Sequence, residues 1–121
     1  MTQSQDTIEV LKTIETIELT TTGRRSGERC TIEIWWFHVD GRFIITGTPG
    51  PRDWYANVLS DPEIEITTNG STYRAIAVPI REPDQRRLVF TAPSTSWYTT
   101  QEELDTLVAT APMIEVQLRL A

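Results

Sequence analysis

Two short turn signals constrain the fold of this chain more than any other feature. Asp40-Gly41 and Asn69-Gly70 each stand between two runs rich in β-branched and aromatic residues. Both dipeptides favour the tight type I′ turn that joins neighbouring antiparallel strands. Parallel strands would need a crossover helix after almost every strand, so the pattern predicts an antiparallel sheet. The runs paired in this way are residues 30–39 with 42–48 and residues 63–68 with 71–80.

Two further segments, residues 15–21 and 113–120, alternate apolar and polar side chains. This period of two is typical of a strand with one buried face. Together with the hairpins these segments give six strands. The predicted fold class is mainly β, a small antiparallel barrel with short peripheral helices.

Helical signals lie between the strands. Asp6 and Glu9 fit a capping box for a helix over about residues 7–13, and Asp53 fits the N-cap of a short helix that stops before Pro62. Residues 83–111 are predicted to be helical, with a break at Pro93. The predicted apolar face of this last segment consists of Leu88, Val89, Leu104, Leu107 and Val108.

Length and charge exclude several classes of protein. The chain has 121 residues, which predicts one domain over residues 1–121. Its formal charge of −6 argues against general nucleic-acid binding, which needs a basic face. The longest apolar run, residues 32–39, is too short to cross a bilayer, and the first ten residues lack the basic and apolar parts of a signal peptide. We therefore expect a cytoplasmic protein.

Conventional catalytic and metal-binding constellations are scarce. His38 is the one histidine and Cys30 the one cysteine, which excludes multi-histidine zinc sites, thiolate-rich sites and an internal disulfide. We predict no metal. Within one strand these two residues would lie roughly 26 Å apart, too far for a nucleophilic pair. His38 is expected in a strand near a turn, and Cys30 as a small, part-buried apolar side chain.

Two segments contain side chains and backbone groups that can bind an anion. The turn at residues 23–27 places Arg24, Arg25 and Ser26 between glycines, and the loop at residues 47–51 precedes Arg52 and a helix start. Guanidinium, hydroxyl and backbone N–H groups can converge on phosphate or carboxylate. A solvated turn is an equally good interpretation of the arginine pair. Trp35 and Trp36 are adjacent in a strand, so one is expected in the core and the other in a groove or subunit interface.

The segments LTTTGRRSGERCTIEIWW, DGRFIITGTPGPRDWYANVLSDPEIEI and GSTYRAIAV, taken in this order, resemble the deazaflavin-dependent nitroreductase family. The resemblance spans about residues 19–78 and implies a split β-barrel of the FMN-binding type that holds coenzyme F-420, a hydride carrier with an anionic tail. It assigns phosphate contacts to Arg24, Arg25 and Ser26. It also assigns cofactor contacts to Thr46, Gly47, Thr48, Pro49, Asp53, Trp54 and Asn57, and Arg52 joins them from the loop argument above.

The implied activity is a small oxidoreductase that passes a hydride from reduced F-420 to an electron-poor acceptor, namely a quinone, an enone or a nitro compound. Because the cofactor carries the difficult chemistry, no catalytic triad is needed. Tyr98 and Tyr55 are candidate proton donors by chemical type alone, although packing is the more common role for either. An FMN-dependent reductase, a non-catalytic flavin, haem or lipid binder, and a homodimer with tryptophans at its interface stay open as alternatives.

Overall fold

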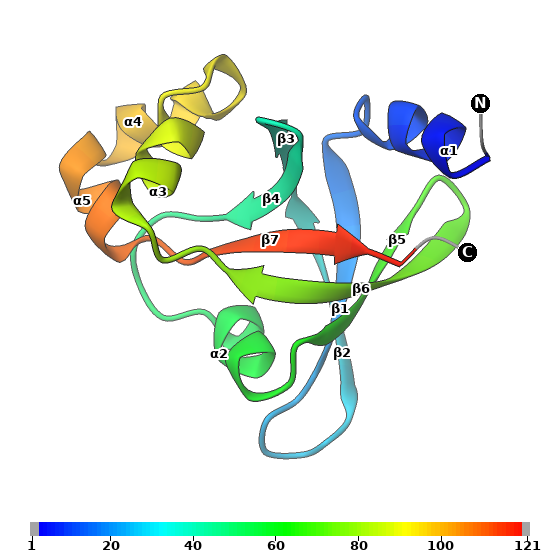
Figure 1. Ribbon diagram of the computed structural model, residues 1–121. Coiled ribbons are helices and arrows are strands. Elements are labelled where there is room, and N and C mark those ends of the chain that lie inside the picture. Colours follow the sequence, from blue (N-terminus) through cyan, green and yellow to red (C-terminus); the bar gives the residue numbers. More distant parts are fainter. Residues whose placement is uncertain (1–2, 120–121) are drawn as a thin grey trace.

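The computed structural model describes residues 3–119, with side chains from Thr7 onward. Seven strands form one curled sheet in which every neighbouring pair is antiparallel (Figure 1). The sheet order is β2-β1-β5-β6-β7-β4-β3. The architecture is the mainly β half-barrel that the sequence predicts. The strands are β1 (Thr16–Thr22), β2 (Arg29–Trp35), β3 (Phe37–Val39), β4 (Arg42–Thr46), β5 (Glu63–Thr68), β6 (Ser71–Pro79) and β7 (Met113–Leu118).

Short helices surround this sheet. In Figure 1, α3, α4 and α5 gather at one side of the sheet, whereas α1 lies at the opposite side near the chain termini. No helix among the described residues is long and apolar enough to span a membrane. The helices are α1 (Gln3–Leu11), α2 (Asp53–Ser60), α3 (Pro83–Phe90), α4 (Ser96–Gln101) and α5 (Leu104–Thr110), with a 3-10 turn at Pro93–Thr95.

The described part of the chain has seven strands and not the predicted six, because the segment over residues 30–39 is broken at Trp36. The backbone N–H of Trp36 donates to the carbonyl of Glu15 at 2.9 Å, and its indole N–H donates to the carbonyl of Ile14 at 2.8 Å. Before this point the chain pairs with β1, and after it with β4. One predicted hairpin strand thus supplies both edges of the half-barrel. Trp36, 2% exposed, stacks on Phe43 inside it.

Both predicted turns are confirmed. Asp40 and Asn69 each have a φ of 53°, and the glycine that follows each one also has a positive φ, as a type I′ turn requires. Each turn joins strands that pair with each other, β3 with β4 and β5 with β6. The local turn chemistry therefore fixes two of the strand pairings.

Three helical predictions need correction. Helix α1 begins at Gln3, so Asp6 lies inside the helix and not at its N-terminus. The N-cap position of α2 is Arg52, which makes no side-chain cap bond, and Asp53 is the first helical residue. Leu88 is 45% exposed and is not part of the apolar face, because α3 packs through Val89 and Phe90.

Two apolar clusters share the central strands. Inside the half-barrel lies a core from five strands together with Trp36, Trp54 and Val58. Ile44 and Met113 point to the other face of β4 and β7, where α3, α4 and α5 cover them in a second cluster. Tyr98 belongs to this second cluster, so the helices at the side of the sheet decide its position.

A buried arginine fixes those helices. Arg86 is 7% exposed, and its guanidinium donates hydrogen bonds to four backbone carbonyls, which belong to Ile80, Leu107, Val108 and Ala111. Burial lowers the pKa of Arg86 from its usual value. The side chain thereby connects α3 to the C-terminal end of α5 and to the residue after β6.

Candidate active site

Two neighbouring cavities contain most of the residues predicted to form the site. The turn cavity, about 380 Å³, lies between the turn at residues 23–27 and α2. The tryptophan cavity, about 310 Å³, lies between β2, the loop after β4 and α4. Trp54 lines both, so the two cavities meet at one aromatic wall. The turn cavity is lined by Thr21, Gly23, Arg24, Arg25, Ser26, Cys30, Ile32, Asp53, Trp54 and Asn57. The tryptophan cavity is lined by Thr16, Glu33, Ile34, Trp35, Thr46, Gly47, Thr48, Arg52, Trp54, Trp97 and Tyr98.

The turn that carries the arginine pair has little room for side chains at its base. The N–H of Gly23 donates to the carbonyl of Glu28 at 2.7 Å, which closes the turn. A Cβ atom at position 23 would lie 2.7 Å from the Ser26 Oγ and 3.3 Å from the Glu28 carbonyl oxygen, so a larger residue would have to displace the Ser26 hydroxyl. The closed turn holds Arg24, Arg25 and Ser26 at its tip, beside α2.

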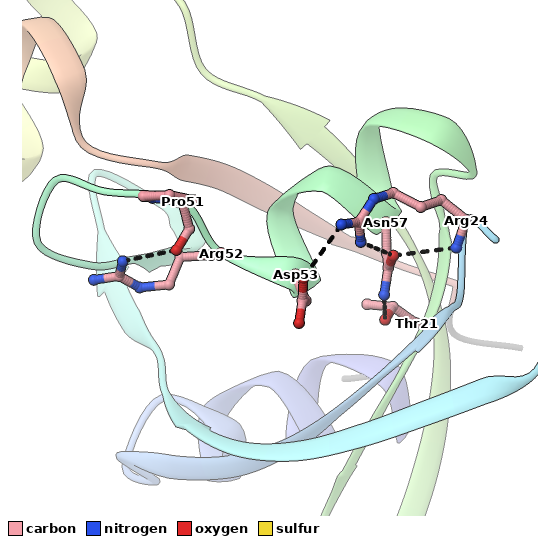
Figure 2. Close-up of polar contacts among 6 residues, drawn as sticks. All are labelled: Thr21, Arg24, Pro51, Arg52, Asp53 and Asn57. Atoms are coloured by element: carbon pink, nitrogen blue, oxygen red, sulfur yellow. Dashed lines mark hydrogen bonds and ion pairs between the residues drawn. The ribbon is translucent and has the colours of Figure 1, made fainter. Parts of the chain in front are cut away.

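Arg24 is tied to α2 (Figure 2). Its backbone N–H and its Nη1 donate to the Asn57 Oδ1 at 3.2 and 2.8 Å, and its Nη2 lies 3.2 Å from the Asp53 Oδ1. Asn57 is 4% exposed and also donates from Nδ2 to the Thr21 Oγ1 at 3.1 Å. The network joins the turn, β1 and the first two turns of α2 into one unit.

Arg25 differs from Arg24, because no hydrogen bond or ion pair joins its side chain to any residue that the structure describes. Its neighbour Ser26 accepts a hydrogen bond from the Glu28 N–H at 3.1 Å, which leaves the hydroxyl hydrogen free to donate. Arg29 does not reach this cavity, because its guanidinium bonds Thr22 and Glu65 on the other side of the strand. Arg25 is therefore the cation of the turn cavity that can bind an external anion without losing an internal partner.

The loop between β4 and α2 is held by its own arginine. Nη2 of Arg52 donates to the carbonyl and the hydroxyl of Thr48, both at 2.9 Å. Nη1 donates to the carbonyl of Pro51 at 3.1 Å (Figure 2). Thr46 is buried and its hydroxyl donates to the carbonyl of Pro112 at 2.5 Å. Arg52 thus shapes the wall of the tryptophan cavity. Pro49, a predicted contact, lines neither cavity.

Four aromatic side chains line the tryptophan cavity, namely Trp35, Trp54, Trp97 and Tyr98. Trp35 and Trp97 are each 48% exposed and meet edge to face with ring centroids 5.8 Å apart. Trp97 also contacts Tyr98, at 5.1 Å between centroids. The expectation for the adjacent tryptophans is confirmed, since Trp36 is in the core and Trp35 faces a groove. Such a cavity suits a flat, largely apolar ring.

The two candidate tyrosines are separated. Tyr98 lines the tryptophan cavity and is 4% exposed, and burial raises the pKa of its hydroxyl although Arg52 acts in the opposite direction. Its hydroxyl is therefore a neutral O–H group at physiological pH. Tyr55 lines a different cavity, of about 530 Å³, next to Arg86. The fold brings Tyr98 to the candidate site and leaves Tyr55 outside it.

Cys30 and His38 complete the comparison with the sequence. Cys30 is exposed, not part-buried as expected, because β2 is an edge strand at the turn cavity. His38 lies in β3, as predicted, next to Phe43, and lines neither cavity.

Sequence reasoning missed Trp97 as a lining residue. Its position beside Tyr98 was the available signal, but α4 reaches the cavity through tertiary packing alone.

Comparisons with known proteins identify the family and the fold of the chain. A family model described as "F420H(2)-dependent quinone reductase" matches residues 1–111. An F-420-H2-dependent reductase has a similar structure, with a TM-score of 0.62, 18% identity and coverage of 85% of this chain and 94% of that chain. A putative pyridoxamine 5′-phosphate oxidase from Listeria innocua has a TM-score of 0.71 at 10% identity, with 98% and 95% covered. A structure described as a domain-swapped dimer has a TM-score of 0.62 at 17% identity, with 94% and 96% covered. A comparison with curated protein sequences found no match.

Proposed function

The chain belongs to the family of quinone reductases that depend on reduced coenzyme F-420, and from that premise we propose that its two cavities bind the cofactor and a quinone-class acceptor for hydride transfer. Membership makes the protein an oxidoreductase that uses F-420. Enones and nitro compounds are the other acceptors to test, because they too are electron-poor and planar.

The single observation that supports this assignment is the meeting of a cationic and an aromatic cavity at Trp54. The turn cavity offers the unpaired Arg25 guanidinium and the Ser26 hydroxyl, which suit the anionic tail of the cofactor. The tryptophan cavity offers Trp54, Tyr98 and the backbone of Thr46, Gly47 and Thr48, which suit its flat ring. The donor set therefore fits a molecule with an aromatic head and an acidic tail.

The protein supplies orientation and a proton. Bound F-420 in its reduced form supplies the hydride. A quinone that accepts a hydride must also accept one proton to become a neutral quinol. Tyr98 lines the cavity proposed for the ring, and its hydroxyl, whose pKa burial raises from an already high value, carries the proton that it can donate. Tyr98 gives up this proton and recovers one from solvent after turnover.

Trp35 and Trp97 form the acceptor side of the proposed site. Both line the tryptophan cavity and keep about half of their surface exposed, so an acceptor can approach from solvent and lie against them. Their pairing is apolar and carries no charge, which favours neutral aromatic acceptors over anionic ones.

A titration tests the cofactor assignment directly. The purified protein is titrated with F-420, FMN and FAD while cofactor and tryptophan fluorescence are followed. Saturable binding of F-420, with quenching because Trp54 and Trp97 line the cavity, is the expected result. No saturation with F-420 would overturn the proposal. Tighter binding of FMN than of F-420 would indicate an FMN-dependent reductase instead.

A matched pair of arginine variants tests the turn cavity. Arg25→Ala is expected to weaken F-420 binding about tenfold or more, because a charge-assisted contact is lost, and to leave the melting temperature unchanged. Arg29→Ala removes the same charge four residues later, at the start of β2, where the side chain faces Thr22 and Glu65. Equal effects of the two variants on binding would reject a specific role for Arg25.

The proposal also covers the oligomeric state of the protein and its location in the cell. We propose a homodimer, which the likeness to a domain-swapped dimer supports, and a cytoplasmic location; sedimentation velocity tests the first and cell fractionation the second. The haem-binding alternative is disfavoured, because His38 lines neither cavity.

A further inference from the structure

We propose that Asp53 is an internal competitor for anions in the turn cavity, so that its carboxylate occupies Arg24 until a phosphate-bearing ligand displaces it. The inference rests on the proposed function for the identity of the natural ligand, a phosphate in the cofactor tail. It changes the role of Asp53 from a cofactor contact, as the family resemblance implies, to a residue that weakens binding and sets its specificity.

The contacts of Arg24 divide into a permanent and a removable part. Asn57 is buried and held on its other side by Thr21, so its hydrogen bonds to Arg24 persist. The Asp53 side chain is 92% exposed, and within the described part of the chain its carboxylate contacts Arg24 alone, at 3.2 Å. Figure 2 shows the Arg24 side chain reaching Asp53 at the start of α2. A rotation of Asp53 into solvent therefore frees the Arg24 Nη2 group at little cost.

Charge makes the exchange favourable for a phosphate. With Asp53 in place, the turn cavity has two guanidinium groups and one carboxylate. A phosphate that takes the place of the carboxylate gains Arg24 in addition to Arg25. A weakly charged ligand cannot displace Asp53, whereas an anion with several charged oxygens can. The exposed ion pair is worth at most about 1 kcal/mol, so the competition is expected to alter affinity by about two- to fivefold.

The test compares two aspartate variants of the full chain. Asp53→Asn removes the competing charge, and Asp105→Asn is the matched control. Asp105 also lies in the first turn of a helix, is 85% exposed and pairs with an arginine, Arg87, at 2.8 Å. It lines neither of the two cavities. Both variants lose one negative charge and one favourable interaction with a helix N-terminus.

F-420 binding is measured by fluorescence at several salt concentrations. Asp53→Asn is expected to bind about two- to fivefold more tightly than wild type. Its affinity should also fall more steeply with salt, because its cavity carries one more net positive charge. Asp105→Asn should match wild type in both respects. Unchanged or weaker binding by Asp53→Asn would overturn the inference, as would equal tightening in the control.

A second readout is independent of the cofactor. Cys30, the one cysteine of the chain, is exposed at the turn cavity, so its alkylation rate by a maleimide reports on the occupancy of that cavity. Inorganic pyrophosphate should protect Cys30 at lower concentration in Asp53→Asn than in wild type. This result would support competition between Asp53 and the anion for Arg24 even if F-420 did not bind and the proposed function were rejected. Equal protection in the two proteins, or none in either, would reject it.

Discussion

At the scale of single residues, four arginines near the two cavities have four different roles because their partners differ. Arg24 is committed to α2, Arg52 to its own loop and Arg29 to the far side of β2. Arg25 has no partner among the described residues and is the one that can bind an external anion without displacing an internal partner. The chemistry of the guanidinium group is the same in each case. Availability for binding is decided by which acceptors already surround it.

His38 gives a prediction about pH at this scale. Burial, with a smaller contribution from Lys12, lowers the pKa of His38 below its usual value of 6.5. Between that lowered value and about 6.5 the unfolded chain binds more protons than the folded protein, so stability falls as the pH falls through this window. The melting temperature of wild type should therefore drop more between about pH 7 and about pH 5 than that of His38→Gln.

The comparison isolates one group, because His38 is the one histidine in the sequence and carboxylates titrate in both proteins. Parallel curves of melting temperature against pH for the two proteins would show that His38 makes no contribution.

At the scale of elements, two buried polar side chains hold helices in place. Asn57 ties α2 to the turn and to β1, and Arg86 ties α3 to the end of α5. Both side chains are buried. Asn57 bonds the Arg24 backbone and guanidinium and the buried Thr21 hydroxyl, and Arg86 bonds backbone carbonyls. Hydrogen bonds of this kind hold a helix at one position against a sheet, which apolar packing alone does less specifically.

Arg86 supplies the prediction for this scale. In Arg86→Met the carbonyls of Ile80, Val108 and Ala111 lose their donor, so unfolding in urea should show a loss of about 3 kcal/mol or more. The adjacent Arg87 is half-exposed and pairs with Asp105, so Arg87→Met should cost about 1 kcal/mol at most. If the two variants lost equal stability, the bonds from Arg86 to the carbonyls would not be what secures the helices.

At the scale of the whole molecule, two apolar clusters are joined through shared strands. Phe43 and Ile45 face the half-barrel core while Ile44, between them, faces the helices, and Met113 and Ile114 divide in the same way on β7. Neither cluster can lose β4 or β7 without exposing the other. We therefore expect residues 1–121 to unfold as one domain.

This expectation is tested by equilibrium unfolding in urea. Transitions followed by far-UV circular dichroism and by tryptophan fluorescence should coincide, because Trp36 and Trp54 lie in the half-barrel core and α3, α4 and α5 depend on the same strands. A Trp97→Phe variant removes the emission from the helical side and should leave the midpoint unchanged. A separate early transition of the helices would mean that the two clusters fold independently.

The sequence by itself determined the features encoded within a few residues. Positive φ at Asp40 and Asn69 follows from local turn chemistry. Period-2 alternation over residues 15–21 and 113–120 predicted the two strands that lie outside the hairpins, β1 and β7. Ten of the eleven proposed cofactor residues, which came from the family resemblance and, for Arg52, from the loop argument, line two cavities that meet at Trp54. Pro49 is the exception.

Tertiary structure alone decided the rest. The break at Trp36 depends on carbonyls of Ile14 and Glu15, more than twenty residues earlier, and the pairing of Arg24 with Asn57 spans 33 residues. The choice of Tyr98 over Tyr55 depends on helices that pack against β4 and β7. Backbone dihedrals are set by neighbours in the chain, whereas side-chain partners are set by neighbours in space. For this reason the sequence could predict most of the residues that line the two cavities but not which of them are free to bind a ligand.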